Sequence, residues 1–154
     1  MSIELNTLCR GLVGHFSFMS TTSSHTVYSE YMLYEPVLRI LYAKGFQAHC
    51  EFTVIKTKKG YNKRIDFRVK NDKKQFGIEI KWAKAAKINV DNDIQKLKAY
   101  SNTYNSPGYL IVFGQYKYIS NLKFSNDPRF ESKGKLVNWD SGKTNYAACW
   151  YRFA

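Results

Sequence analysis

The sequence has few cysteines, few acidic residues and no long hydrophobic run, and each shortage excludes a class of protein. Its three cysteines, Cys9, Cys50 and Cys149, lie far apart, which argues against a disulfide framework and favours a reducing compartment. None has a second Cys or a His at zinc-finger spacing. No apolar stretch is long enough to span a bilayer, and the first residues lack a signal-peptide pattern. We therefore expect a cytoplasmic protein.

Acidic residues are outnumbered, with 12 Asp and Glu against 24 Lys and Arg, which gives a net charge of +12. Residues 1–55 hold three basic and four acidic side chains, whereas residues 56–154 hold twenty-one and eight. A cationic field of this size favours polyanionic partners, with nucleic acid first and an anionic membrane surface second. The alternative is a charge that only maintains solubility. We expect a nucleic-acid partner and no membrane partner.

The clearest local pattern is a β-hairpin over residues 63–81. Polar and apolar residues alternate over 64–70 and again over 75–82, on either side of the polar turn 71–74, and this period is typical of paired strands. If Asn71 and Lys74 close the turn, Asp66 lies opposite Glu79, and Lys81 projects from the same face. The other face is apolar, so a register slip of one residue would mix the two faces.

The polar face of this hairpin suits metal chemistry. Two carboxylates opposite each other repel unless a positive charge lies between them, and Mg²⁺ prefers a few carboxylates with water and phosphate oxygens. A neighbouring lysine can orient or deprotonate a metal-bound water and stabilise developing charge. These groups equip a protein for metal-assisted phosphodiester hydrolysis. The alternative is a solvated cluster in which Arg64, Arg68 and Lys81 neutralise the two acids.

The segments around the hairpin predict two helices and two further strands. Residues 26–44 have helical spacing that Pro36 either kinks or restarts, and Gly45 ends the helix before a strand over 46–55. Asn89 or Asp91 caps a helix over 91–104. Residues 109–113 form a continuous apolar strand of the kind that is buried on both faces. This order predicts an α/β (α+β) fold with a mixed central sheet flanked by helices.

The two ends of the chain carry weaker patterns. Residues 1–24 predict only a short helix that ends at Gly11 or Gly14. Residues 126–128 predict a turn, and 136–139 and 144–153 predict two strands joined at 140–142. Four aromatic residues in this region either close a small core, which we favour, or form a stacking platform. They are Trp139, Tyr146, Trp150 and Tyr151.

The arrangement Ile65-Asp66, a hairpin, then Glu79-Ile80-Lys81 resembles the motif of the PD-(D/E)XK nuclease superfamily. The element order resembles the αβββαβ core of its restriction-endonuclease-like fold. We expect one nuclease-like domain spanning residues 1–154. The resemblance covers roughly residues 26–114 as its core, and residues 115–154 form a C-terminal β-rich, aromatic extension. It implies that Asp66 and Glu79 bind the metal and that Lys81 is the catalytic lysine. Ile65 replaces the eponymous proline, at a position that varies in the superfamily.

The resemblance also implies an acid from the first helix and a residue from the helix that follows the hairpin. Glu30 is our first choice for the acid, because it falls on the apolar stripe of the predicted helix, where a lone charge needs a partner or a metal. Glu35 is the second choice. The alternative for Glu30 is a first-turn acid that the helix dipole stabilises. On the later helix, Gln95 is the residue indicated.

A basic loop precedes the hairpin and suits phosphate contacts. Five of the nine residues 56–64 are Lys or Arg, and an aromatic residue among them can stack on a base, although a solvated turn would have the same composition. The predicted nucleic-acid-binding residues are Lys56, Lys58, Lys59, Tyr61, Lys63, Arg64, Lys84 and Gln95.

The resemblance and the charge together predict a Mg²⁺-dependent endonuclease, with Mn²⁺ as an expected substitute. Its expected substrate is double-stranded or branched DNA. The expected activity is structure-selective cleavage, resolution of DNA junctions, or cleavage in restriction and defence. The alternatives are a catalytically inactive nucleic-acid-binding module on the same fold and an RNA-directed nuclease. A homodimer is one expected assembly, because dimers are common where both strands are cut.

Overall fold

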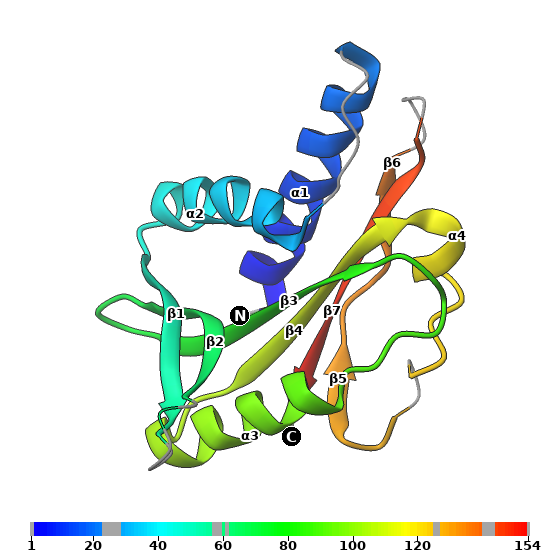
Figure 1. Cartoon of the computed structure of the whole chain (residues 1–154). Helices are drawn as coiled ribbons and strands as arrows, with labels where there is room; N and C mark the ends of the chain where they lie inside the picture. Colours follow the sequence, from blue (N-terminus) through cyan, green and yellow to red (C-terminus); the bar gives the residue numbers. More distant parts are fainter. Residues whose placement is uncertain are drawn as a thin grey trace.

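The computed structural model describes residues 2–22, 29–56, 60, 62–124, 127–139 and 144–153. They form one seven-stranded mixed sheet flanked by helices, as predicted (Figure 1). The strands are β1 (Gln47–Ile55), β2 (Lys63–Lys70), β3 (Gln75–Ala83), β4 (Gly108–Gln115), β5 (Phe130–Lys133), β6 (Val137–Trp139) and β7 (Tyr146–Phe153). The helices are α1 (Ser2–Thr22), the 3₁₀ helix η1 (Glu30–Leu33), α2 (Tyr34–Ala43), α3 (Asp91–Tyr104) and α4 (Tyr116–Ile119).

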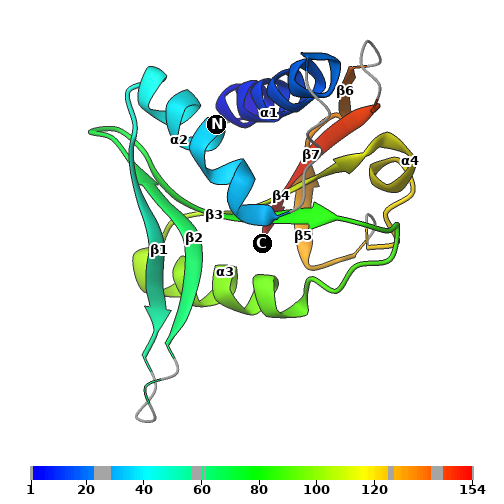
Figure 2. The ribbon, with the colours of Figure 1, turned by 45° about the horizontal axis from the view of Figure 1, so that its top comes forward.

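The strand order is β1-β2-β3-β4-β7-β5, with β6 also paired to β7. Strands β3 and β4 run parallel, and α3 makes the crossover between them. All other pairs are antiparallel. Figure 2 shows α1 and α2 on one face of the sheet and α3 on the other. None of the helices in the described residues has both the length and the apolarity needed to cross a membrane.

The register of the β2–β3 hairpin is the predicted one. Lys70 pairs with Gln75 and Phe67 with Ile78. The Asn71 amide donates to the Lys74 carbonyl oxygen at 2.9 Å, and the Asn71 side chain accepts from the Lys74 amide at 2.8 Å. The turn and the apolar face therefore set the same register, as the alternation requires.

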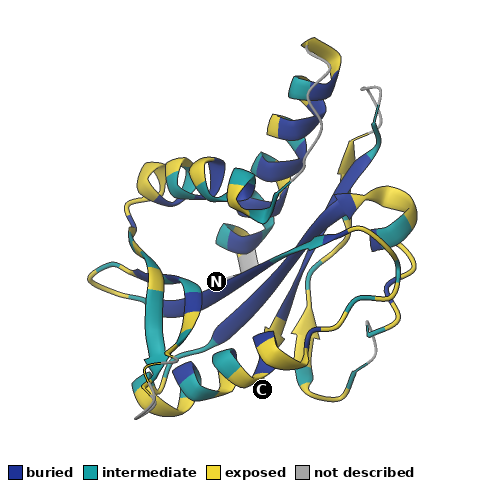
Figure 3. Ribbon diagram, in the orientation of Figure 1, coloured by how far each residue is buried: buried dark blue, intermediate teal, exposed yellow. Residues whose placement is uncertain are grey.

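The helices bury a hydrophobic core on each face of the sheet. Leu12 of α1 and Val37 of α2 pack with the α1–α2 side of β2, β3 and β4, and Leu97 of α3 packs with Leu110 and its neighbours on the other side. Strand β4 is buried along its length except at Gln115, and Figure 3 shows this central buried band. The prediction that residues 109–113 are buried on both faces is confirmed.

The prediction for the N-terminal region was wrong. Helix α1 continues through Gly11 and Gly14 to Thr22 instead of ending at either glycine. Its buried residues lie against the sheet, and this packing outweighs the cost of about 1 kcal/mol for each glycine inside a helix. Gly11 has a packing role, because a Cβ atom there would collide with the side chain of Ile40 on α2.

The second predicted helix is restarted at Pro36, one of the two expected alternatives. The 3₁₀ helix η1 comes first, and Pro36 then lies in the first turn of α2, where no backbone hydrogen bond is lost. Gly45 follows the helix with φ of +79°, the left-handed conformation expected of a terminator. Residues 26–28 of the predicted helix lie outside the described residues. Helix α3 spans the predicted residues 91–104.

The C-terminal strands are close to those predicted, whereas α4 and β5 were not anticipated. The joining residues 140–142 and part of the turn 126–128 lie outside the described residues. Tyr146, Trp150 and Tyr151 are buried, so the core interpretation is confirmed for them. Trp139 is 55% exposed.

Candidate functional site

The site begins where the pairing of β2 with β3 ends. The paired register stops at Phe67 and Ile78, and Figure 2 shows β2 turning away from β3 beyond that point. Two carboxylates then accept hydrogen bonds from the freed edge of β3. Asp66 Oδ2 accepts from the Ile80 amide at 2.6 Å, and Glu30 Oε2 accepts from the Trp82 amide at 2.7 Å. Backbone donors that would lack a strand partner thus hold two acids in place.

Glu79 is the most enclosed acid of the site. It follows Ile78, the last residue of β3 that pairs with β2, and it is only 1% exposed. Its Oε2 accepts a hydrogen bond from Lys96 Nζ at 2.6 Å. Its Oε1 is buried and has no hydrogen-bond partner among the described residues. A buried oxygen without a partner is costly, so this atom is a place where a ligand would lower the free energy.

Helix α3 supplies an acid and a base that the sequence interpretation did not include. Lys81 is partly buried, and its Nζ lies 2.9 Å from Asp93 Oδ2. Lys96 lies 3.6 Å from the other Asp93 oxygen and also binds Glu79. Asp93 therefore joins the two lysines, and α3 fixes the direction in which Lys81 points.

Tyr34, at the start of α2, closes the site from the opposite layer. Its hydroxyl lies 2.5 Å from Asp66 Oδ1 and 3.1 Å from Glu51 Oε1. A hydroxyl donates one proton, so the shorter contact identifies Asp66 as the main acceptor. Glu51 is exposed.

Burial and charge shift the protonation of the central groups. Burial, reinforced by the charge of Asp66, raises the pKa of Glu79 to about 9, and Lys96 does not compensate. Burial also raises the pKa of Asp66, against the hydrogen bonds from Tyr34 and Ile80. For Lys81, burial lowers the pKa, but the hydrogen bond and charge of Asp93 outweigh it and the pKa is raised. Lys81 is therefore a cation at neutral pH.

The raised pKa of Glu79 predicts a protein that loses stability as the pH rises. The folded protein keeps this proton up to about pH 9, whereas the unfolded chain releases it near the ordinary value of 4.5. Between these values the folded state binds more protons, so each increase in pH favours unfolding. We expect the free energy of unfolding, measured by urea titration in EDTA, to fall from pH 5.5 to 8.5.

The Glu79→Gln variant is the control for this pH dependence. Glutamine has the same shape, can still accept from Lys96 and does not titrate, so most of the decline should disappear. A profile that rises with pH in the wild type, or an unchanged slope in the variant, would contradict the assignment of the shift to Glu79.

The described residues contain no group of three or more His, Cys, Asp or Glu side chains placed to hold a metal ion. The predicted three-acid set of Asp66, Glu79 and Glu30 is thus not assembled as a cage. Asp66 lies near enough for its charge to raise the pKa of Glu79, and Glu79 has a buried oxygen without a hydrogen-bond partner among the described residues. Mg²⁺ commonly uses one or two carboxylates and completes its shell with water and substrate phosphate. This pair fits that mode of binding, and Glu30 as a third ligand stays a prediction.

A cleft of about 540 Å³ opens beside Lys81. Glu30, Trp82, Lys84 and Lys87 line it together with Lys81. Three lysines along one cleft favour a phosphate-bearing ligand. Lys84, a predicted nucleic-acid contact, also places its Nζ 4.5 Å from the centre of the Trp82 ring.

The structure separates the two candidate helical acids. Glu30 contacts the β3 edge near Lys81, whereas Glu35 is exposed and pairs with Arg39 one turn along α2. Gln95 does not contact the acids. It is exposed, and its Oε1 accepts a hydrogen bond from Lys63 Nζ at 2.8 Å.

Three of the remaining predicted nucleic-acid contacts, Lys56, Lys63 and Arg64, lie at the open end of the β1–β2 pair. Lys56 and Arg64 are exposed there. Lys58, Lys59 and Tyr61 lie outside the described residues. The contact of Lys63 with Gln95 joins this end of β2 to α3.

Sequence reasoning missed Tyr34, Asp93 and Lys96. A signal for Asp93 was present, because it shares a helical stripe with Leu97 and Tyr100, and it is 5% exposed. The argument that selected Glu30, an acid on a buried stripe, selects Asp93 equally well. No comparable signal marks Tyr34 or Lys96, which are ordinary helix residues until the tertiary contacts are known.

No model of a known protein family matches the chain, and no curated protein is significantly similar to it in sequence.

Proposed function

We propose that this protein is a divalent-metal-dependent nuclease that cleaves DNA, built on a restriction-endonuclease-like core. The observation that carries the proposal is the acid pair of Asp66 and Glu79 at the fork between β2 and β3, with Lys81 beside it on a lysine-lined cleft. The order α2-β1-β2-β3-α3-β4, with β3 and β4 parallel, supports the proposed core. The net charge of +12 supports a polyanionic substrate.

Each residue of the site has a role in this proposal. Asp66 and Glu79 would hold Mg²⁺ or Mn²⁺, and the metal would supply Lewis-acid stabilisation of the scissile phosphate and activation of a water. Lys81, held as a cation by Asp93, stabilises the negative charge that develops on the phosphate oxygens. Tyr34 and the Ile80 amide fix the Asp66 carboxylate. Lys96 donates a hydrogen bond to Glu79 Oε2 and holds this side chain in place while no metal is bound.

A cleavage assay tests this proposal. Supercoiled plasmid, linear duplex and branched DNA are incubated with the protein at low salt, with Mg²⁺, with Mn²⁺ or with EDTA. We expect cleavage of at least one substrate with either metal and none in EDTA. Cleavage at an equal rate in EDTA would contradict the proposal. An RNA substrate in the same series shows whether the protein cleaves DNA, RNA or both.

A second candidate is a nucleic-acid-binding module without catalysis. The ion pairs of Lys96 with Glu79 and of Lys81 with Asp93 favour it, because they satisfy most of the site internally. It predicts salt-dependent DNA binding and no turnover with any metal in the same assay.

A further inference from the structure

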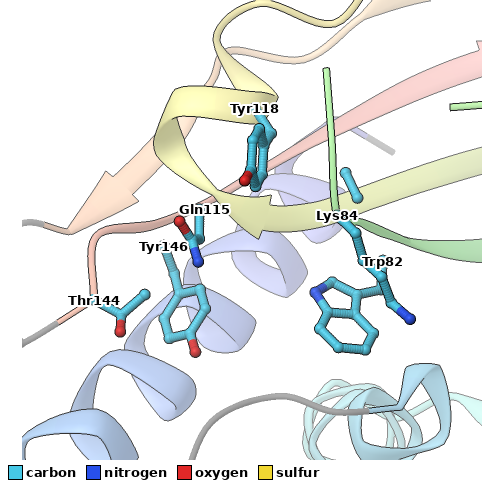
Figure 4. A pocket seen from close by; sticks show the side chains of 7 residues that line it. Trp82, Lys84, Gln115, Tyr118, Thr144 and Tyr146 are labelled. Carbon is cyan, nitrogen blue, oxygen red and sulfur yellow. The ribbon is translucent and has the colours of Figure 1, made fainter. Parts of the chain in front are cut away.

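A second cavity lies next to the proposed active site, beyond the ends of β3 and β4. Its volume is about 260 Å³, small beside the roughly 300–1,000 Å³ of typical small-molecule sites. Figure 4 shows Trp82 and Lys84 on one side, with Gln115, Tyr146 and Thr144 on the other and Tyr118 near the end of α4. This side-chain set, here called the aromatic pocket, is not used by the proposed chemistry.

We propose that the aromatic pocket binds one unpaired nucleobase of the nucleic-acid substrate. This inference rests on the proposed function and narrows its substrate to DNA with an unstacked base near the scissile phosphate. Such bases occur in single strands, at branch points and at frayed ends.

The walls of the pocket suit a flat heterocycle. Trp82 and Tyr118 are only partly buried, so part of each ring is open to a ligand. Tyr146 is fixed by stacking on Phe113, with ring centroids 5.1 Å apart and planes at 26°. Stacking on aromatic side chains tolerates any base, because every base has a π-face. Several rings around a cavity that holds a single ring system therefore favour a base over an extended ligand.

Polar groups in the pocket can bind the edges of a base. Gln115 is exposed and carries both a donor and an acceptor, and Thr144 carries a hydroxyl. Among the described residues neither side chain makes a hydrogen bond, so both are available. Lys84 lies over the Trp82 ring, where it can also meet the phosphate of the bound nucleotide.

The pocket adjoins the cleft of the proposed active site. Trp82 and Lys84 line both cavities, and Lys81 precedes Trp82 on β3. A strand whose phosphates follow Lys81, Lys84 and Lys87 thus has a pocket beside it for one base. A base inside a duplex is stacked on its neighbours and must leave the stack to enter an enclosed site. An unpaired base enters without that cost.

Fluorescence anisotropy in EDTA tests this inference without cleavage. The probes are a fluorescein-labelled single-stranded oligothymidylate, the same strand with successive single abasic positions, and a blunt duplex of equal length. We expect Trp82→Leu and Tyr118→Leu each to weaken single-strand binding by about tenfold, with much less change for the duplex. The exposed Tyr42 lies on α2 outside the pocket, so Tyr42→Leu should bind as the wild type does.

The abasic series makes the test specific. In the wild type, one abasic position should weaken binding about as much as Trp82→Leu, and in Trp82→Leu that position should have no further effect. Wild-type binding by both pocket variants would overturn the inference. Should Trp82→Leu fail to fold by circular dichroism, Tyr118→Leu and Gln115→Ala decide the outcome.

The outcome is separable from that of the proposed function. Base-dependent binding without cleavage in any metal would contradict the proposed nuclease activity and support the proposed base-binding pocket. Metal-dependent cleavage, together with wild-type single-strand binding by the pocket variants, would support the proposed nuclease activity and contradict the proposed base-binding role of the pocket.

Discussion

Replacing Lys81 with alanine is expected to reduce metal-dependent DNA cleavage by roughly a thousandfold or more, while DNA affinity changes by less than about threefold. The reason is that Lys81 is the cation that Asp93 directs beside the acid pair. In the proposed mechanism it acts where charge develops in the transition state, whereas binding would depend on many cations of which it is one. The measurement is the nicking rate of supercoiled plasmid, with affinity measured separately in EDTA.

Lys73→Ala is the matched control for this variant. Lys73 is an exposed residue in the β2–β3 turn, and its loss removes the same charge from the same hairpin, so cleavage should stay near the wild-type rate. Removal of Lys81 leaves Asp93 with Lys96 as its cation, so urea unfolding should confirm that the variant is folded. Full cleavage by folded Lys81→Ala would exclude this lysine from catalysis.

The second large effect is on stability, and it concerns how α3 is held against the sheet. Leu97 is fully buried, and it packs so closely on β4 that a Cβ atom at Gly108 would come within 3.0 Å of its side chain. Leu97→Ala should lower the free energy of unfolding by about 3 kcal/mol, within the range of roughly 2–5 kcal/mol for such a truncation. Urea unfolding followed by circular dichroism measures the loss.

Lys98→Ala is the control for Leu97→Ala, because the next residue of the same helix is exposed. We expect a change within about 0.5 kcal/mol for it. Equal losses in the two variants would show that burial of Leu97 does not set the stability of α3. Because α3 carries Asp93 and Lys96, the same packing determines the geometry of the site.

The sequence predicts most of the hairpin and little of what surrounds it. Alternation on both sides of a turn closed by Asn71 and Lys74 predicts the register of β2 with β3 as far as Phe67 and Ile78, so local information places Asp66 and Glu79 just beyond the last pair. Helix α3 is also predictable from its apolar spacing, although its N-cap is Val90 and not the expected Asn89 or Asp91. In both cases residues close in sequence carry the pattern.

The other parts of the site depend on contacts between distant segments. Tyr34 reaches Asp66 across 32 positions, and nothing in the α2 sequence indicates which strand it will meet. Gln95 and Lys96 are adjacent on α3, but about 100° of helical rotation separates them. That rotation sends Gln95 to Lys63 and Lys96 to Glu79. The long α1 was missed because its glycines indicate termination locally, whereas packing on the sheet keeps it helical.

The central claim is that Asp66 and Glu79 bind a divalent metal beside Lys81. Electron paramagnetic resonance of Mn²⁺ added to the Lys81→Ala protein with bound DNA tests it most directly, because the substrate phosphates are present and turnover is blocked. We predict one bound Mn²⁺ per chain, lost when Asp66→Asn or Glu79→Gln is added to this background. The same bound Mn²⁺ signal with and without these two acids would contradict the metal site.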